Sequence, residues 1–307
     1  MFRFPDKARV CFVGDSLTHN NRYVCHIVSY YREHFPDSGV EFYNCGTSGG
    51  HLGTMLTIWE QDVMRYEPTH IVLMTAVNDA KTSSFKRFSG IERYNALYAA
   101  YEEYQERLKL FCQKVKDIGA ELILCVPLPF AEYQCAPDRV LPGGSALILG
   151  YADFIRQFAK ENGYPLCDYH SYLSRIMQEE DIYAEDGVHL KNRGQYHLAK
   201  CFLAFQGLDL GEEKELPEDI VLWDEKVRSV RDNFAAVHLV LGDSWFSKSA
   251  EEQMQAFEAF MARDHEKLGT LEFQIRYATA YLNGKKDEEK NIAYLKAFMK
   301  RGEAENA

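Results

Sequence analysis

Short apolar runs rich in β-branched and aromatic residues recur along the sequence and alternate with segments of helical periodicity. The runs lie at residues 8–13, 40–44, 70–75 and 121–126, with a weaker one at 165–168. Parallel strands that are buried on both faces have this continuous apolar character, and the helices between them lie on the two faces of the sheet. The alternation therefore predicts a parallel sheet covered by helices on both sides.

The longest intervening helix is expected at about residues 92–118 and ends near Gly119, a suitable C-terminal capping residue. Its large apolar residues recur at three- and four-residue spacing, which predicts one buried face. These residues are Tyr94, Leu97, Tyr101, Tyr104, Leu108 and Phe111.

The character of the sequence changes after about residue 207. The stretch "LDLGEEKELPED" is polar and contains proline, and residues 219–304 carry helical patterns with charged faces. We therefore predict an α/β domain at 1–206 and a C-terminal helical extension at 207–307.

The charge balance limits the partners of the chain. With 46 Asp and Glu against 35 Lys and Arg, the chain lacks the excess of cations that nucleic acids and anionic membranes attract. No apolar stretch reaches membrane-spanning length, and no signal-like leader precedes residue 8. We expect a soluble, cytoplasmic protein with a small-molecule partner, no nucleic acid and no membrane insertion.

The eight cysteines are scattered without a CxxC pair, and several lie inside apolar runs. Reduced cysteine packs there as a small hydrophobic residue, so we predict no metal site and assign Cys45 to packing.

Two segments without clear periodicity, 80–91 and 128–147, directly follow strands. Open α/β sheets bind ligands at the carboxyl ends of their strands, which makes both segments candidate pocket walls or lids. Ordinary surface loops would have the same sequence character.

Ser16 follows the first apolar run, in "VGDSLT", where a serine can serve as a helix N-cap or as a nucleophile. The nucleophile interpretation needs a base, and "DGVH" at 186–189 offers one. Asp186 can accept from one nitrogen of His189 and leave the other facing outward as a general base.

Two further post-strand turns offer donors for an oxyanion, at 44–50 ("NCGTSGG") and at 76–79 ("AVND"). A glycine allows its N–H to approach a substrate closely, and an asparagine amide donates without carrying charge.

Taken together, "GDSL" at 14–17, "NCGTSG" at 44–49, "AVND" at 76–79 and "DGVH" at 186–189 resemble the four blocks of the SGNH (GDSL) hydrolases, in the same order. The resemblance covers about residues 8–206. It implies a three-layer α/β/α fold with a flavodoxin-like five-stranded parallel sheet.

By this resemblance Ser16 is the nucleophile, His189 is the base, and Asp186 orients the imidazole. The N–H groups of Ser16 and Gly49 and the amide of Asn78 form the oxyanion hole. The implied enzyme is an esterase of the GDSL acylhydrolase type that needs no cofactor or metal.

One position departs from the family pattern. The third block usually begins with glycine, and here that position is Ala76. The added methyl group is tolerated there if the backbone angle is ordinary, but it can also narrow the acyl site, which would affect the size of the substrate more than the mechanism.

Other residues offer weaker candidates for the same chemistry. A second "GDS" at 242–244 includes Ser244, but no partner blocks follow it, so we interpret it as a turn. Asp168 and His170 form a rival acid–base pair, although Asp168 also suits the start of a helix. His19 and His51 lie near the motifs, as substrate contacts or as surface residues.

We predict a serine esterase that hydrolyses a short, acetyl-like acyl ester of a carbohydrate or other small alcohol through an acyl-enzyme. An acyltransferase, a lysophospholipase or a thioesterase uses the same residues, and a non-catalytic binding module keeps the same fold. The sequence leaves open which of these applies, and whether the chain forms a homo-oligomer.

Overall fold

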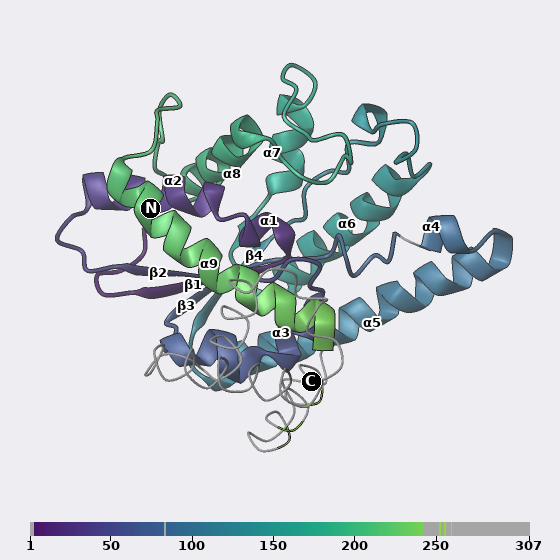
Figure 1. Ribbon diagram of the computed structural model, residues 1–307, viewed down its shortest axis with the longest axis horizontal. Coiled ribbons are helices and arrows are strands. Elements are labelled where there is room, and N and C mark those ends of the chain that lie inside the picture. The colour runs from purple at the N-terminus through teal and green to yellow at the C-terminus, as the bar shows by residue number, and fades with distance from the viewer. Residues whose placement is uncertain (1–2, 83, 242–251, 253–254, 256–258, 260–307) are drawn as a thin grey trace, which may run out of the picture. The chain divides into compact units, whose positions relative to one another are not determined.

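Five parallel strands form one sheet in the order β2-β1-β3-β4-β5 (Figure 1). Their bounds are β1 Arg9–Gly14, β2 Glu41–Gly46, β3 His70–Met74, β4 Glu121–Cys125 and β5 Leu166–Cys167. The chain passes from β1 to β2 on one side of β1 and then crosses to β3 on its other side, as in doubly wound flavodoxin-like folds. The predicted fold class and all five strands are confirmed.

Helices cover both faces of this sheet (Figure 1). Along β1, Val10 and Phe12 pack into one core, and Cys11 and Val13 pack into the other. The first core includes residues of α2 (Arg22–His34), α7 (Tyr169–Ile176) and α8 (Asn192–Phe205). The second includes residues of α3 (Leu52–Thr57), α5 (Gly90–Asp117) and α6 (Gly144–Asn162). Alternate strand residues thus enter opposite cores, which explains the continuous apolar runs.

The remaining elements are short, except for one long helix whose Ile220 is buried in the first core. They are α1 Ser16–His19, α4 Ser84–Arg87, α9 Glu218–Leu241, a π-helical turn Trp59–Val63, and 3₁₀ turns Met64–Tyr66 and Glu132–Gln134. Among the residues that the structure describes, no helix is long and apolar enough to cross a membrane.

Helix α5 confirms the predicted long helix, but only part of its apolar face is core. Tyr104, Leu108 and Phe111 are buried, whereas Tyr94 is 62% exposed. The prediction that the whole aromatic face is buried is therefore wrong at its start. The reason is length, because 28 residues of helix extend about 42 Å, whereas a five-residue strand spans only about 17 Å.

The structure is a computed structural model, and it describes residues 3–82 and 84–241 together with residues 252, 255 and 259. Contacts divide the chain into two units, Met1–Arg228 and Ser229–Ala307, and the candidate site lies in the first. The boundary predicted between residues 206 and 207 stays a prediction. The second "GDS" with Ser244, and most of the predicted helical extension, lie outside the described residues.

Candidate active site

Ser16 is the first residue of α1, directly after the end of β1, and the residue before it caps the helix. Asp15 is the N-cap, and its carboxylate accepts the N–H of Leu17 at 3.0 Å. The alternative interpretation of Ser16 as the cap is therefore wrong. Because Asp15 satisfies the free N–H of the helix start, the Ser16 hydroxyl is left to bond elsewhere.

The Ser16 hydroxyl is hydrogen-bonded to the imidazole of His189, and the imidazole to Asp186. Ser16 Oγ lies 2.8 Å from His189 Nε2, and His189 Nδ1 lies 2.6 Å from Asp186 Oδ2. An ionised carboxylate only accepts, so Nδ1 carries the ring proton and Nε2 accepts from the serine hydroxyl. The structure brings these three residues together in the geometry of a nucleophile, a base and an orienting acid.

The turn at "DGVH" holds the Asp186 carboxylate in place. Asp186 Oδ1 accepts the backbone N–H groups of Val188 at 3.0 Å and His189 at 2.9 Å. Partial burial alone would raise the pKa of the Asp186 carboxyl, but the hydrogen bonds from the His189 ring and these backbone groups outweigh it and hold the pKa below its usual value. The carboxylate therefore stays ionised beside the imidazole.

The two donor turns meet at the same edge of the sheet. The Asn78 amide nitrogen donates to the carbonyl oxygen of Gly50 at 2.9 Å. A carbonyl only accepts, so the Asn78 amide presents its nitrogen on this side and keeps a second N–H for another acceptor. Gly49, next to Gly50, has φ of +72°, a conformation that glycine adopts without strain.

Ala76 has a backbone conformation that favours glycine. Its φ is +110°, and its side chain is fully buried. A non-glycine residue with such a φ costs on the order of 1–3 kcal/mol. An alanine was expected to be tolerated here if its backbone angles were ordinary, and they are not. Ala76 is therefore a strained residue, two positions before Asn78.

A match to a protein-family model identifies the family of the chain. The model of the GDSL-like lipase/acylhydrolase family matches residues 12–196, which contain all four blocks. The chain belongs to the GDSL-like lipase/acylhydrolase family. It is accordingly a carboxylic ester hydrolase.

Relatives of this GDSL-like hydrolase have low sequence identity to it. An acetylxylan esterase from Geobacillus stearothermophilus is 22% identical over 218 residues, covering 66% of this chain and 94% of the relative. The solved structure of Axe2, an acetylxylan esterase from the same organism, covers 68% of this chain and 99% of its own, with 21% identity and a TM-score of 0.56. Other solved forms of Axe2 are described as catalytic mutants, with a serine, an aspartate or a histidine replaced by alanine.

A gut microbial diltiazem-metabolizing enzyme has a TM-score of 0.58 at 23% identity, covering 67% of this chain and 48% of its own. At these identities the solved structures support the fold of the GDSL-like hydrolase.

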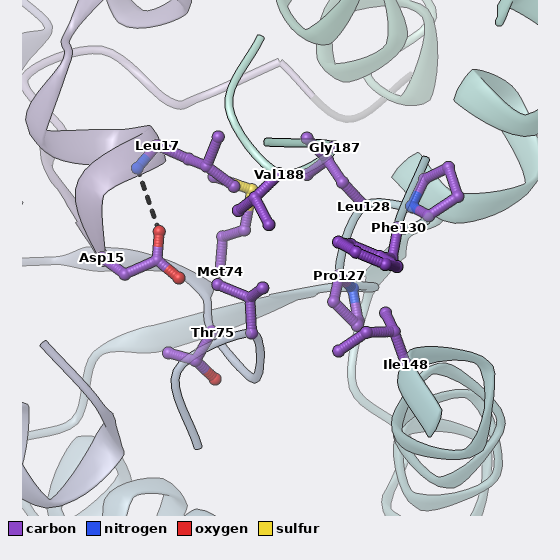
Figure 2. A pocket seen from close by; sticks show the side chains of 12 residues that line it. Asp15, Leu17, Met74, Thr75, Pro127, Leu128, Phe130, Ile148, Gly187 and Val188 are labelled. Carbon is purple, nitrogen blue, oxygen red and sulfur yellow. Dashed lines mark hydrogen bonds between the residues drawn. The ribbon is translucent and has the colours of Figure 1, made fainter. Parts of the chain in front are cut away.

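Figure 2 shows the side chains that line a small, mostly apolar cavity. Its volume is about 10 Å³, about the least that holds one water molecule. Its lining includes the chain neighbours of Ser16, Asn78 and His189. The lining residues are Asp15, Leu17, Met74, Thr75, Val77, Pro127, Leu128, Pro129, Phe130, Ile148, Gly187 and Val188.

The candidate loop at 128–147 supplies part of this lining, through Leu128, Pro129 and Phe130. The sequence marked the segment but not the individual residues. The Phe130 ring occupies space that exists because residue 144 is glycine, since a Cβ there would lie 2.7 Å from the ring. The apolar sequence "PLPF" at residues 127–130, directly after the β4 run, could have indicated these lining residues, because it continues the apolar character of the strand into the loop.

The Asp15 carboxyl is fully buried beneath the nucleophile. Burial raises its pKa to about 7, the hydrogen bond from the Leu17 N–H lowers it, and the nearby Asp79 and His189 have smaller, opposite effects. The folded protein therefore binds this proton more tightly than an unfolded chain with the ordinary pKa of 3.8. Stability conferred by the protonated carboxyl is lost as the pH rises through about 7.

We therefore expect Asp15→Asn to become more stable relative to the wild type as the pH rises. The amide keeps an oxygen for the Leu17 N–H but does not ionise, so the difference in Tm grows between about pH 4 and about pH 8. Thermal melts across this range measure it, with the exposed Asp37→Asn as control. A difference in Tm that does not change with pH would contradict the raised pKa.

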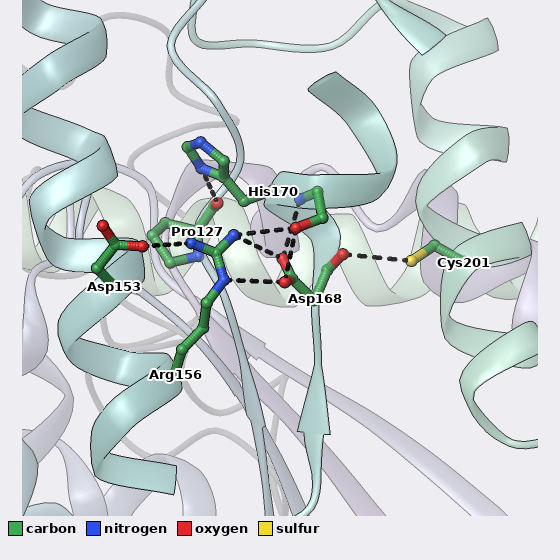
Figure 3. Close-up of polar contacts among 7 residues, drawn as sticks. Pro127, Asp153, Arg156, Asp168, His170 and Cys201 are labelled. Atoms are coloured by element: carbon green, nitrogen blue, oxygen red, sulfur yellow. Dashed lines mark hydrogen bonds and ion pairs between the residues drawn. The ribbon is translucent and has the colours of Figure 1, made fainter. Parts of the chain in front are cut away.

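The rival acid–base pair has structural contacts (Figure 3). Asp168 is the N-cap of α7, accepting the Ser171 N–H at 2.9 Å, and its carboxylate binds Arg156 through Nε at 2.9 Å and Nη2 at 3.1 Å. His170 Nδ1 lies 3.2 Å from the carbonyl oxygen of Pro127. These contacts support the interpretation of Asp168 as a helix start.

The other residues singled out from the sequence also have local contacts. His51 is the N-cap of α3, and its Nδ1 accepts the N–H of Thr54 at 3.1 Å. His19 ends α1 and is partly buried. Cys45 is buried in the core beside α3 and α5, as predicted. In the described part of the chain, no three His, Cys, Asp or Glu side chains are grouped so as to bind a metal ion.

Proposed function

We propose that the protein is a serine esterase that removes an acetyl-sized acyl group from a carbohydrate or another small alcohol through an acyl-enzyme. One observation carries the proposal, the continuous hydrogen bonding from Ser16 Oγ to His189 at 2.8 Å and from His189 to Asp186 at 2.6 Å. The catalytic mutants of Axe2 support it, because the replaced aspartate and histidine of that protein are also three positions apart.

In the proposed reaction, Ser16 Oγ attacks the acyl carbon while His189 Nε2 takes the hydroxyl proton. The carbonyl oxygen gains negative charge, which the N–H groups of Ser16 and Gly49 and the Asn78 amide stabilise. His189 returns the proton to the leaving alcohol. A water molecule then attacks the acyl carbon of the acyl-enzyme and gives a proton to His189. The bond from the acyl carbon to Ser16 Oγ breaks, His189 returns the proton to Oγ, and the carboxylic acid leaves.

The cavity supports a short acyl group. A volume of about 10 Å³ holds a group about as large as one water molecule, so the cavity favours the smallest acyl group. Each additional methylene in a pocket of fixed size costs roughly 1–3 kcal/mol of discrimination. This size argues against a fatty acyl chain, as a lysophospholipase would require. The acetylxylan esterases among the relatives support a carbohydrate as the alcohol.

Hydrolysis of acetylated xylooligosaccharides and of p-nitrophenyl esters tests the proposed function. We expect acetate release from both substrate types by the wild type, without an added metal or cofactor. Absence of turnover on every ester would contradict the esterase and favour a binding module. Transfer of the acetyl group to an added sugar in place of hydrolysis would favour an acyltransferase.

A chain-length series tests the cavity. For the wild type we expect kcat/KM to fall about tenfold or more per added methylene from p-nitrophenyl acetate to butyrate. Phe130→Ala removes a ring that lines the cavity, so kcat/KM for butyrate and longer esters should rise relative to kcat/KM for acetate. The milder Phe130→Val covers the case in which the alanine variant does not fold.

Tyr133→Ala is the matched control for this series. It removes a ring from the same loop, but Tyr133 is 97% exposed and does not line the cavity. The ratio of acetate to butyrate activity should not change in this variant. An unchanged ratio in folded Phe130 variants would show that the acyl group binds elsewhere.

A further inference from the structure

We infer that Asp224, on helix α9, is a positioning residue for Ser16 and for the loop that carries Gly49. It acts through two buried asparagines, Asn21 and Asn44. Asp224 lies outside the residues 12–196 that the family model matches, so the family match does not include this contact. The inference rests on the proposed function, because it concerns the placement of the proposed nucleophile and oxyanion donors.

A series of hydrogen bonds joins Asp224 to Asn44, the first residue of the motif block at 44–49. Asp224 Oδ1 accepts from the Asn21 amide nitrogen at 2.9 Å, and Asn21 Oδ1 accepts from the Asn44 amide nitrogen at 2.7 Å. The exposed fractions of the three residues are 5%, 0% and 4%. These bonds are thus shielded from water, where a lost partner is costly.

Asn44 connects this series to both turns of the proposed site. Its amide nitrogen also donates to the carbonyl oxygen of Thr18 at 2.6 Å, and its oxygen accepts the N–H of Gly46 at 2.8 Å. Thr18 belongs to α1, the short helix that begins with Ser16. Gly46 leads into the turn that contains Gly49. One side chain therefore fixes the nucleophile turn against the oxyanion turn.

The orientation of every amide in this series follows from its partners. The Thr18 carbonyl only accepts and the Gly46 N–H only donates, which fixes the orientation of the Asn44 amide. Asn44 then donates to the oxygen of Asn21, so the nitrogen of Asn21 faces α9. That nitrogen needs an acceptor, and Asp224 supplies it.

The two turns are packed too closely to move independently. A Cβ atom on Gly46 would lie 2.3 Å from the backbone nitrogen of His19. Asn21 has φ of +66°, a left-handed conformation that asparagine adopts more readily than most other non-glycine residues. Removing the acceptor on α9 releases the Asn21 amide, and through it the orientation of Asn44.

The test compares Asp224→Ala with Asp224→Asn. The asparagine variant keeps an oxygen for Asn21, whereas the alanine variant has no acceptor. We expect Asp224→Ala to lower kcat on p-nitrophenyl acetate about 10- to 100-fold, the usual effect of misplacing reacting groups from a distance. KM should change little, and Asp224→Asn should keep most of the activity.

Asp219→Ala is the matched control. Asp219 also lies on α9 and binds Arg32 at 2.7 Å, but both side chains are exposed and the contact lies away from the two asparagines. Its kcat should equal that of the wild type. If Asp219→Ala and Asp224→Asn both lose as much activity as Asp224→Ala, general loosening of α9 explains the result and the positioning role is wrong.

Amide hydrogen exchange gives a readout that does not depend on activity. In Asp224→Ala, the amides of residues 16–20 and 46–50 should exchange faster than in the wild type, and in Asp219→Ala they should not. Exchange that is unchanged in folded Asp224→Ala would overturn the inference. A wild type without esterase activity would contradict the proposed function, and this measurement would still decide the role of Asp224.

Discussion

Ser16→Ala is expected to abolish esterase activity while the protein stays folded. The variant removes the attacking oxygen, and loss of a nucleophile costs up to about 10⁶-fold in kcat in a serine hydrolase. The fold should survive, because the bond that caps α1 comes from Asp15. Turnover of p-nitrophenyl acetate and the Tm of the same preparation measure both expectations.

Labelling identifies the nucleophile independently of kinetics. An organophosphonate should modify Ser16 in the wild type and leave the Ser16→Ala variant unmodified. Ser244→Ala, at the second "GDS" of the sequence, is the matched control and should keep wild-type activity. Undiminished turnover in Ser16→Ala, or a label on Ser244, would refute the assignment.

Asn78→Ala is expected to lower kcat by about 10²–10³, the usual effect of losing one oxyanion donor, with little change in KM. The amide nitrogen of Asn78 binds the Gly50 carbonyl and has a second N–H to offer. Asn78→Asp should be at least as damaging, because it places a negative charge beside the developing oxyanion.

A purely structural role of Asn78 predicts a different result. In that case the variant would lose stability, and its kcat would fall only in proportion to the folded fraction. Asn162→Ala is the control, because it removes a similar amide-to-carbonyl bond, to Phe158 at 2.8 Å, on an exposed surface. A folded Asn78→Ala enzyme with nearly wild-type kcat would rule out the catalytic role.

The sheet was predictable because its central strands β1, β3 and β4 are buried on both faces along most of their length. Residues Ile71 to Met74 of β3 contribute alternately to two cores. This stretch is therefore continuously apolar and differs from the periodic helices around it. The chain order of the motif blocks then placed the candidate residues at one edge of the sheet, since parallel strands end there together.

The details that the sequence did not reveal depend on single backbone angles or on distant contacts. Asp15 and Ser16 are both good N-cap residue types, so only the structure shows that Asp15 is the cap. Alanine itself does not mark position 76 as a residue with positive φ, because such positions are usually signalled by glycine. The one indication was the resemblance to a family that usually has glycine there, and the structure supplies the angle itself.

Hydrogen bonds between residues far apart in the sequence leave no periodic pattern from which they could be predicted. Asn21 and Asp224 are 203 positions apart, and each is an ordinary polar residue in its own segment. The exposure of Tyr94 was missed for a related reason, since apolar periodicity continues along α5 and carries no information about where the sheet beneath it ends.

The assignment of the helix cap to Asp15 separates the folding of this turn from its proposed chemistry. Ser16→Ala should therefore keep an intact pocket that binds an ester without consuming it. Such a variant is a substrate trap, in which a ligand raises the melting temperature in proportion to the logarithm of its concentration over its Kd. Candidate acetylated sugars can then be ranked by binding alone, and the natural alcohol of the ester can be identified in a mixture by what the inert variant retains.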